Sequence, residues 1–296
     1  MVKRTSEGGK HRDDASRTTR LHKSFKRSYR EDYRRELELP SITAQVFKSF
    51  QVIFKNWRIF LPLLLIAVVL SLLLVGVDES ASYSGTAMTF RILIFLMVFL
   101  VTIFILRRRL TGREVGLREA LYNAMTPLLS TLVVFLVAAV QSIPIILLII
   151  GYSAAVQTDF LKMPFYALLF LVFAALMILL SGYLLSSSLI ALVAVSAPGL
   201  YPLKALRSAS DLMAGRRMKF IYRLIALIIV MILVWVIIML PMISFEAFMK
   251  QFAWAAGIPF VQICLTVVIG FIEIYVTTYL YIYYRYLLKF DSKSEK

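Results

Sequence analysis

One acidic side chain stands inside an otherwise apolar stretch near the end of the sequence. Glu273, in GFIEIYVTT, lies about 15 residues into an apolar run, which at 1.5 Å per residue is deep in the hydrocarbon if the run crosses a membrane. A carboxylate there costs roughly 3 kcal/mol, so we expect it to be protonated, paired or facing a wet interior. Ser181 lies at a comparable depth on the fourth run, and Gln141 lies one turn before Pro144 on the third, where we expect a kink. The fourth run is longer than a perpendicular crossing needs, so we expect a tilt or a break near Ser181 and Gly182.

These residues predict an intramembrane polar site of Glu273, Ser181 and Gln141 that binds a proton or a cation. The alternative is a protonated Glu273 that only hydrogen-bonds between helices. The six tyrosines of YVTTYLYIYYRYLLK are explained better as a belt at the membrane interface than as a ligand cage.

Arginine and lysine gather beside the apolar runs rather than within them. These clusters are topology determinants first, and contact with lipid phosphates is the second hypothesis. The residues concerned are Lys204, Arg207, Arg216, Arg217, Arg107, Arg108 and Arg109.

Several kinds of chemistry lack the residues they need. The only histidines, His11 and His22, lie in the N-terminal tail, and Cys264 is the only cysteine. A zinc or haem site of the usual ligands cannot be assembled among the apolar runs, and neither can Ser-His or Cys-His catalysis. We therefore expect no metal, no cofactor and no enzymatic activity.

The composition indicates a membrane protein that crosses the bilayer several times. Of 296 residues, 60% are hydrophobic and 17% are charged, yet the formal net charge is +16. Runs of about 20 apolar residues are long enough to cross a bilayer. Six such runs predict an all-α integral membrane protein, with spans at about 59–77, 89–106, 128–151, 164–197, 220–243 and 258–288. We expect no cleaved signal peptide, because the first 40 residues hold no apolar core of that kind.

The distribution of basic residues predicts the orientation. With the first 40 residues left out, eighteen lysines and arginines fall on one side of the six spans, whereas Arg91, Lys162 and Lys250 alone fall on the other. The positive-inside rule therefore places both termini in the cytoplasm, with the chain in the plasma membrane.

Three segments before spans one, three and five have apolar residues at helical spacing. They predict cytoplasmic interfacial helices whose apolar faces enter lipid: SITAQVFKSFQVIFKNW, LREALYNAMTP and PLKALRSASDLMAG. Aligning Val46, Ala120 and Ala205 gives a three-fold parallel repeat of one interfacial helix and two spans. Any bundle of hairpins with positive cytoplasmic loops would produce a similar rhythm, so that alternative stays open.

The last of these segments resembles part of a loose group of bacterial and archaeal six-span membrane domains, some of them fused to glycerophosphodiester phosphodiesterases. The matching positions are Pro202, Ala205, Leu206, Ser208, Leu212 and Gly215, followed by Arg216 and Arg217. The resemblance implies six-span architecture over residues 40–290 and assigns no activity, since nothing in the chain looks like the phosphodiesterase.

The chain divides by composition into three parts. Residues 1–40 form a basic cytoplasmic tail, partly disordered, in which an apolar residue every four positions from Leu21 to Leu37 predicts a helix on the membrane or on a protein partner. A tail that only enforces the orientation of the protein explains this composition equally well. We expect no nucleic-acid contact, because no nucleic-acid-binding fold is visible in the sequence. Residues 41–290 form the six-span membrane domain, and residues 291–296 form a C-terminal cytoplasmic tail.

The sequence thus favours a non-enzymatic membrane protein that engages anionic lipids at its basic cytoplasmic face, in envelope organisation or lipid handling. The main alternative is a small-solute or ion transporter centred on Glu273, and an intramembrane enzyme comes third. The sequence specifies neither the ligand nor the oligomeric state.

Overall fold

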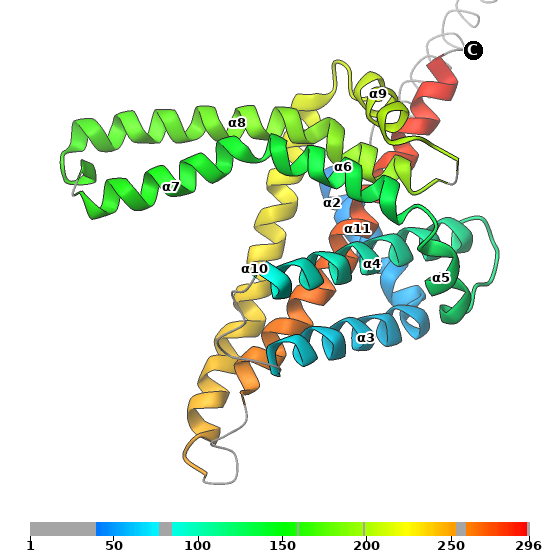
Figure 1. Cartoon of the computed structure of the whole chain (residues 1–296), viewed down its shortest axis with the longest axis horizontal. Helices are drawn as coiled ribbons and strands as arrows, with labels where there is room; N and C mark the ends of the chain where they lie inside the picture. Colours follow the sequence, from blue (N-terminus) through cyan, green and yellow to red (C-terminus); the bar gives the residue numbers. More distant parts are fainter. Residues whose placement is uncertain (1–39, 77–84, 159, 198, 253–258, 295–296) are drawn as a thin grey trace, which may run out of the picture. The chain divides into compact units, whose positions relative to one another are not determined.

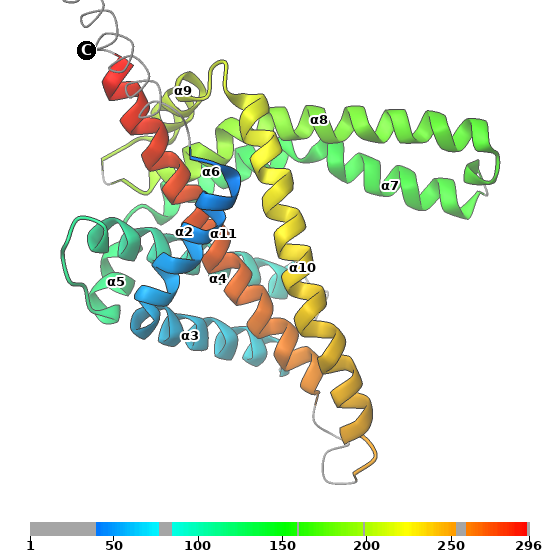
Figure 2. The same ribbon diagram turned by 180° about the vertical axis from the view of Figure 1, so that it is seen from behind.

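The computed structural model describes residues 40–76, 85–158, 160–197, 199–252 and 259–294, and these residues are helical with turns and contain no strand. The predictions for residues 1–39 lie outside this part. From Ile42 onward the chain forms one compact unit. Its helices, drawn in Figures 1 and 2, are α2 (Ile42–Lys55), α3 (Trp57–Gly76), α4 (Gly85–Arg109), α5 (Leu117–Ala124), α6 (Leu128–Gln141), α7 (Ile143–Gln157), η2 (Phe160–Lys162), α8 (Pro164–Val195), α9 (Pro202–Leu212), α10 (Arg217–Met249) and α11 (Phe260–Ser294).

Five of the described helices are long and apolar enough to cross a membrane: α3, α4, α8, α10 and α11. A sixth candidate arises if α5 and α6, which meet at a bend of 67°, are counted as one span; α7 is apolar but shorter. The chain therefore has the helices of a multi-pass membrane protein, with five or six spans among its described residues. The last helix runs on to Ser294, beyond the end predicted for span six and into the predicted C-terminal tail.

The third predicted span is interrupted, whereas the fourth is not. Ser142 separates α6 from α7 two residues before Pro144, which has no N–H to donate to the preceding turn, so the predicted kink lies here. The predicted break near Ser181 and Gly182 does not occur, because α8 is one helix from Pro164 to Val195. The tilt that was its alternative stays a prediction. Gly182 leaves ordinary van der Waals space, with Ile221 of α10 3.7 Å from where a Cβ would lie, so nothing there forces a break.

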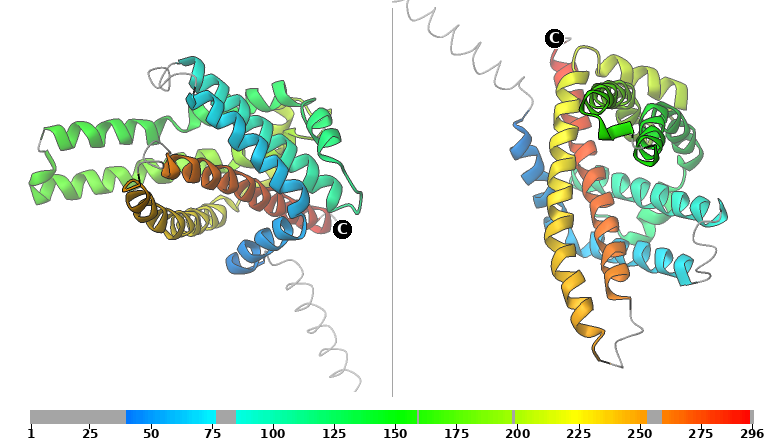
Figure 3. Two further views of the ribbon diagram at one scale, coloured as in Figure 1. Left: turned by 90° about the horizontal axis from the view of Figure 1, so that it is seen from below. Right: turned by 90° about the vertical axis from the view of Figure 1, so that its left-hand side faces the viewer.

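Each pair of long helices forms a hairpin. In the first hairpin α3 contacts α4, and in the second both α6 and α7 contact α8. In the third, α10 contacts α11, and these two helices run side by side in Figure 3. The core lies where α4 and α11 meet the ends of the other hairpins, and it includes Leu63, Leu96, Val98, Ile190, Tyr275 and Leu287. Most side chains of α7 and of the first half of α8 are exposed and apolar, as lipid-facing surfaces require.

The three short helices α2, α5 and α9 share one pattern of burial. Counting from the residue before each helix, the fifth and ninth positions are buried: Gln45 and Ser49 in α2, Ala120 and Ala124 in α5, Ala205 and Ala209 in α9. The predicted alignment used Val46, which is one residue too late. Helix α2 turns Gln45 inward because Arg223 of α10 donates a 2.7 Å hydrogen bond to its side-chain oxygen.

The innermost apolar residues of α5 and α9 contact protein, which corrects the prediction that they enter lipid. In α9, Ala205 and Ala209, together with Met213 just beyond the helix, have no exposed surface, and α9 packs against α8. Alanine allows this close approach because its side chain is small. Helix α2 instead splits its apolar residues, since Phe47 and Phe54 remain exposed on its outer side while Ile53 is buried.

Candidate functional site

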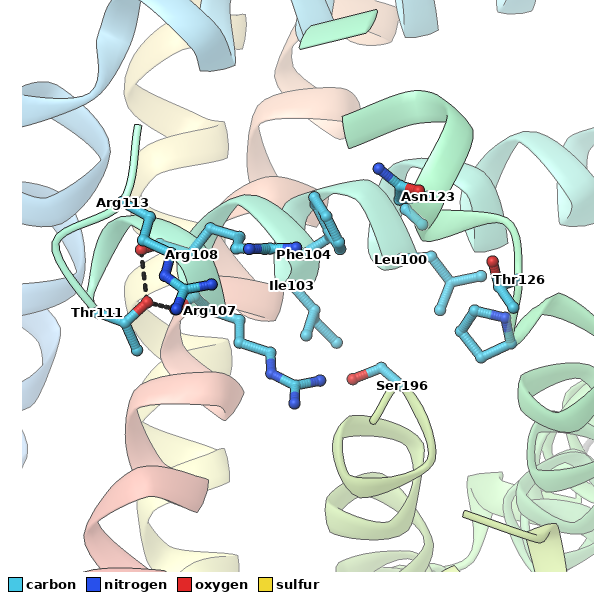
Figure 4. A pocket seen from close by; sticks show the side chains of 12 residues that line it. Leu100, Ile103, Phe104, Arg107, Arg108, Thr111, Arg113, Asn123, Thr126 and Ser196 are labelled. Atoms are coloured by element: carbon cyan, nitrogen blue, oxygen red, sulfur yellow. Dashed lines mark hydrogen bonds between the residues drawn. The ribbon is translucent and has the colours of Figure 1, made fainter. Parts of the chain in front are cut away.

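A cavity of about 600 Å³ lies at the end of α4, between α4, α5 and the residue that follows α8. Figure 4 shows the residues that line it, with the Arg107 side chain extending toward Ser196. We call it the basic cavity. Its lining comprises Leu100, Ile103, Phe104, Arg107, Arg108, Thr111, Arg113, Asn123, Ala124, Thr126, Pro127 and Ser196.

The turn after α4 brings the arginines to this cavity. Gly112 has φ 79°, a left-handed conformation in which a residue without a Cβ is unstrained. The Arg113 amide donates to the Arg108 carbonyl at 3.1 Å and the Gly112 amide donates to the Arg109 carbonyl at 3.1 Å, which is the hydrogen-bond pattern of a Schellman motif. The Thr111 hydroxyl also donates to the Arg107 and Arg108 carbonyls. The chain therefore turns back on itself, and Arg113 joins Arg107 and Arg108.

The cavity combines a cationic rim with an apolar floor. Leu100 and Ile103 are buried in the floor, and the Arg108 guanidinium lies 5.4 Å from the centre of the Phe104 ring. Thr126, Asn123 and Ser196 add neutral donors on the opposite wall. Three arginines line the cavity and no acidic residue does, so its chemistry fits an anionic oxygen group attached to an apolar body.

A second cleft, of about 400 Å³, continues on the other side of Arg113. Helix α2 contributes Lys48 and Lys55, and the α4 end contributes Arg109. This cleft contains one acidic residue, Glu114, whose carboxylate lies 3.9 Å from the Arg109 guanidinium. Arg109 is therefore partly compensated by Glu114, whereas Arg113 lines both the cleft and the basic cavity.

The other predicted phosphate contacts lie elsewhere. Lys204 and Arg207 are exposed on α9. The Arg217 guanidinium donates to the Ser210 hydroxyl at 3.0 Å and lies 4.5 Å from the centre of the Tyr183 ring, so it joins α10 to α9 and α8. Arg216 is half-buried at the start of α10 and has interactions of its own. The prediction therefore grouped residues that the structure separates.

The predicted intramembrane site is only partly assembled. Ser181 donates to the Gln141 backbone carbonyl at 3.0 Å, and the Ser188 hydroxyl donates to the Gln141 side-chain oxygen at 2.6 Å. Glu273 lies apart from them, in a cavity lined by α3, α4 and α11. Grouping Glu273 with Ser181 was wrong because equal depth along two helices does not determine which faces meet.

A buried polar cluster went unpredicted. Arg223 is only 8% exposed and lies between α2 and α11, with its guanidinium 5.6 Å from the centre of the Tyr283 ring. Gln45 also donates to the Tyr279 carbonyl, and the Tyr275 hydroxyl donates to the Val46 carbonyl. The tyrosines at 275, 279, 281 and 283 are buried, so they form a core rather than the predicted surface belt. Tyr275, Tyr279 and Tyr283 recur every four residues and so share one face of α11, which was the signal available in the sequence.

Among the described residues, no group of three or more His, Cys, Asp or Glu side chains is arranged to hold a metal ion. The apolar helices and the basic cavity at the end of α4 are the features that bear on function. No family model, no curated protein and no solved structure matches this chain.

Proposed function

We propose that this protein is a non-enzymatic six-span membrane protein that binds the phosphate group of an anionic lipid in the basic cavity, in lipid handling or envelope organisation. The observation that carries the proposal is the cavity itself, where Arg107, Arg108 and Arg113 surround an apolar floor without an acid among the lining residues. Guanidinium groups bind phosphate oxygens through paired hydrogen bonds, and the floor suits the first carbons of a lipid tail.

The proposed topology counts α6 and α7 together as the third span and places both termini in the cytoplasm. The support is the charge asymmetry, because the basic residues at the end of α4, on α9 and at the start of α10 fall on one side in this arrangement. The basic cavity then opens at the cytoplasmic leaflet, where anionic lipids attract each basic side chain by about 1 kcal/mol.

The architecture we propose is a three-fold repeat of one short helix and one hairpin. Its support is the pattern of contacts, which is the same in each unit. Each short helix packs on the second long helix of the preceding hairpin: α5 on α4, α9 on α8 and, closing the ring, α2 on α11. The first helix of each hairpin also contacts the second long helix of the preceding hairpin: α6 contacts α4, α10 contacts α8 and, closing the ring, α3 contacts α11.

The shared burial pattern of the short helices is the second support for the repeat. Residues 202–217, which resemble a segment of known six-span membrane domains, fall on α9 and the start of α10. That placement agrees with the same architecture.

The experiment is retention of a lipid by the purified protein. The protein in mild detergent is offered phosphatidylglycerol or phosphatidylcholine, and native mass spectrometry counts the bound lipid. We expect preference for phosphatidylglycerol, and a loss of about 30-fold in its affinity on R107Q/R108Q, because two contacts at about 1 kcal/mol each are removed.

The matched control is K204Q/R207Q, which removes the same charge from the exposed side of α9. We expect it to retain phosphatidylglycerol nearly as well as the wild type. Equal losses of phosphatidylglycerol affinity in both variants would mean that diffuse electrostatic attraction to the basic surface holds the lipid, and that the cavity does not. No preference for phosphatidylglycerol in the wild type would end the proposal.

A further inference from the structure

A second cavity, of about 320 Å³, lies between α3, α4 and α11. It shares no lining residue with the basic cavity: on α4 it is lined by Arg91, Ile94 and Phe95, whereas the basic cavity begins at Leu100. Its volume is at the lower end of the range for small-molecule sites. Any ligand must therefore be small.

One face of α11 supplies a row of polar positions along this cavity. Gln262, Thr266 and Glu273 line it at helical spacing, with Gly270 between the last two. A Cβ at Gly270 would lie 2.8 Å from the Leu64 side chain, so the glycine allows α3 to lie close beside α11. Ser71 of α3 adds a hydroxyl group to the lining.

An acidic and a basic side chain line the same cavity. One side-chain oxygen of Glu273 is buried and accepts no hydrogen bond, although such an atom costs free energy when left without a partner. Arg91 supplies the positive charge, and the structure shows no direct ion pair between these two described side chains. The remaining lining is largely apolar, with Ala67, Val68, Phe95, Leu265 and Ile269.

We propose that this cavity binds a small zwitterion with an apolar side chain, its ammonium group at Glu273 and its carboxylate group at Arg91. Such a ligand satisfies both charges at once, and the apolar lining accepts its side chain. A cation alone would leave Arg91 uncompensated, and an anion alone would leave Glu273 without its partner. The site is independent of the lipid-binding proposal because the two cavities share no residue.

The test compares three probes that carry the same isobutyl side chain. Leucine carries both charges, 3-methylbutylamine carries only the ammonium, and 4-methylpentanoate carries only the carboxylate. Binding to the purified protein in nanodiscs is measured by isothermal titration calorimetry. We expect leucine to bind at least tenfold more tightly than either analogue, and E273Q and R91Q each to abolish this preference.

Two further variants keep the result interpretable. I94W fills the cavity while both charges remain, and it should also abolish leucine binding. E246Q removes an acid of α10 that lies outside the cavity and pairs with Lys250 at 2.7 Å, so it should leave leucine binding unchanged. Leucine that binds no better than its analogues, or that binds equally well to E273Q or I94W, would overturn the proposal.

Discussion

At the scale of single residues, Arg223 joins three helices. It extends from α10 to the Gln45 side chain of α2 and to the Tyr283 ring of α11, and it is almost entirely buried. A buried charge is costly unless hydrogen bonds satisfy it, and removing one partner leaves the other uncompensated. Arg223 and Gln45 therefore depend on each other.

We predict that R223M destabilises the protein by about 1–3 kcal/mol, because the Gln45 oxygen loses its donor inside the protein. Q45M should also destabilise it, since the Arg223 guanidinium then loses its acceptor. The double variant Q45M/R223M should be more stable than the sum of the single losses predicts, because it removes both polar partners. Denaturation in detergent, followed by tryptophan fluorescence, measures all three; strictly additive losses would contradict the coupling.

Residue types were more predictable than their partners. The cluster at residues 107–109 is visible in the sequence, but the other wall of the basic cavity comes from Asn123 and Ser196, which only the fold brings close. Gln45 and Arg223 are likewise far apart in the chain. Depth along a helix follows from counting residues, whereas the direction in which Glu273 faces depends on helix packing.

At the scale of elements, length and apolar composition predicted where the long helices lie, and local chemistry decided their interruptions. Pro144 marks the break beside Ser142, since proline removes a helical hydrogen bond. Serine and glycine at 181 and 182 gave no comparable reason for a break, and α8 continues through them. Glycine in a helix interior lowers helix stability but does not end the helix.

Two glycines give a matched test of this distinction. Gly182 lies inside α8 with room for a methyl group, so G182A should stabilise the protein by up to about 1 kcal/mol through higher helix propensity. Gly215 has φ 70° with open space around it, so G215A should destabilise it by about 1–2 kcal/mol through backbone strain alone. Thermal unfolding in detergent compares the two. A marked loss of stability in G182A would contradict the assignment of Gly182 to an ordinary helix interior.

At the scale of the whole molecule, the contacts between helices show which elements are neighbours, and composition alone could not predict this. The three short helices are similar in rhythm, but only the fold pairs α5 and α9 with the hairpin that precedes each of them. The pairing of α2 with α11 joins the first and last described helices of the unit. In a closed ring the two ends of the unit support each other, and the Arg223 cluster lies at this junction.

The number of spans depends on whether α6 and α7 cross the membrane together. If they do, residues on α5 and residues next to η2 lie on opposite sides; if the chain turns back within the bilayer, they lie on the same side. Tyr122 on α5 is 84% exposed, Met163 beside η2 is 62% exposed and Leu203 on α9 is 79% exposed, so all three positions are open to labelling.

We predict that, in a C264S background, M163C reacts with a membrane-impermeant maleimide in intact cells, whereas Y122C and L203C react only after the membrane is permeabilised. This result follows from six spans with the basic residues at the end of α4 and on α9 inside, because moving these charges across the bilayer is costly. Gel-shift labelling of each variant measures it. If M163C and Y122C are labelled from the same side, α6 and α7 do not cross the membrane, the chain has five spans, and its two ends lie on opposite sides.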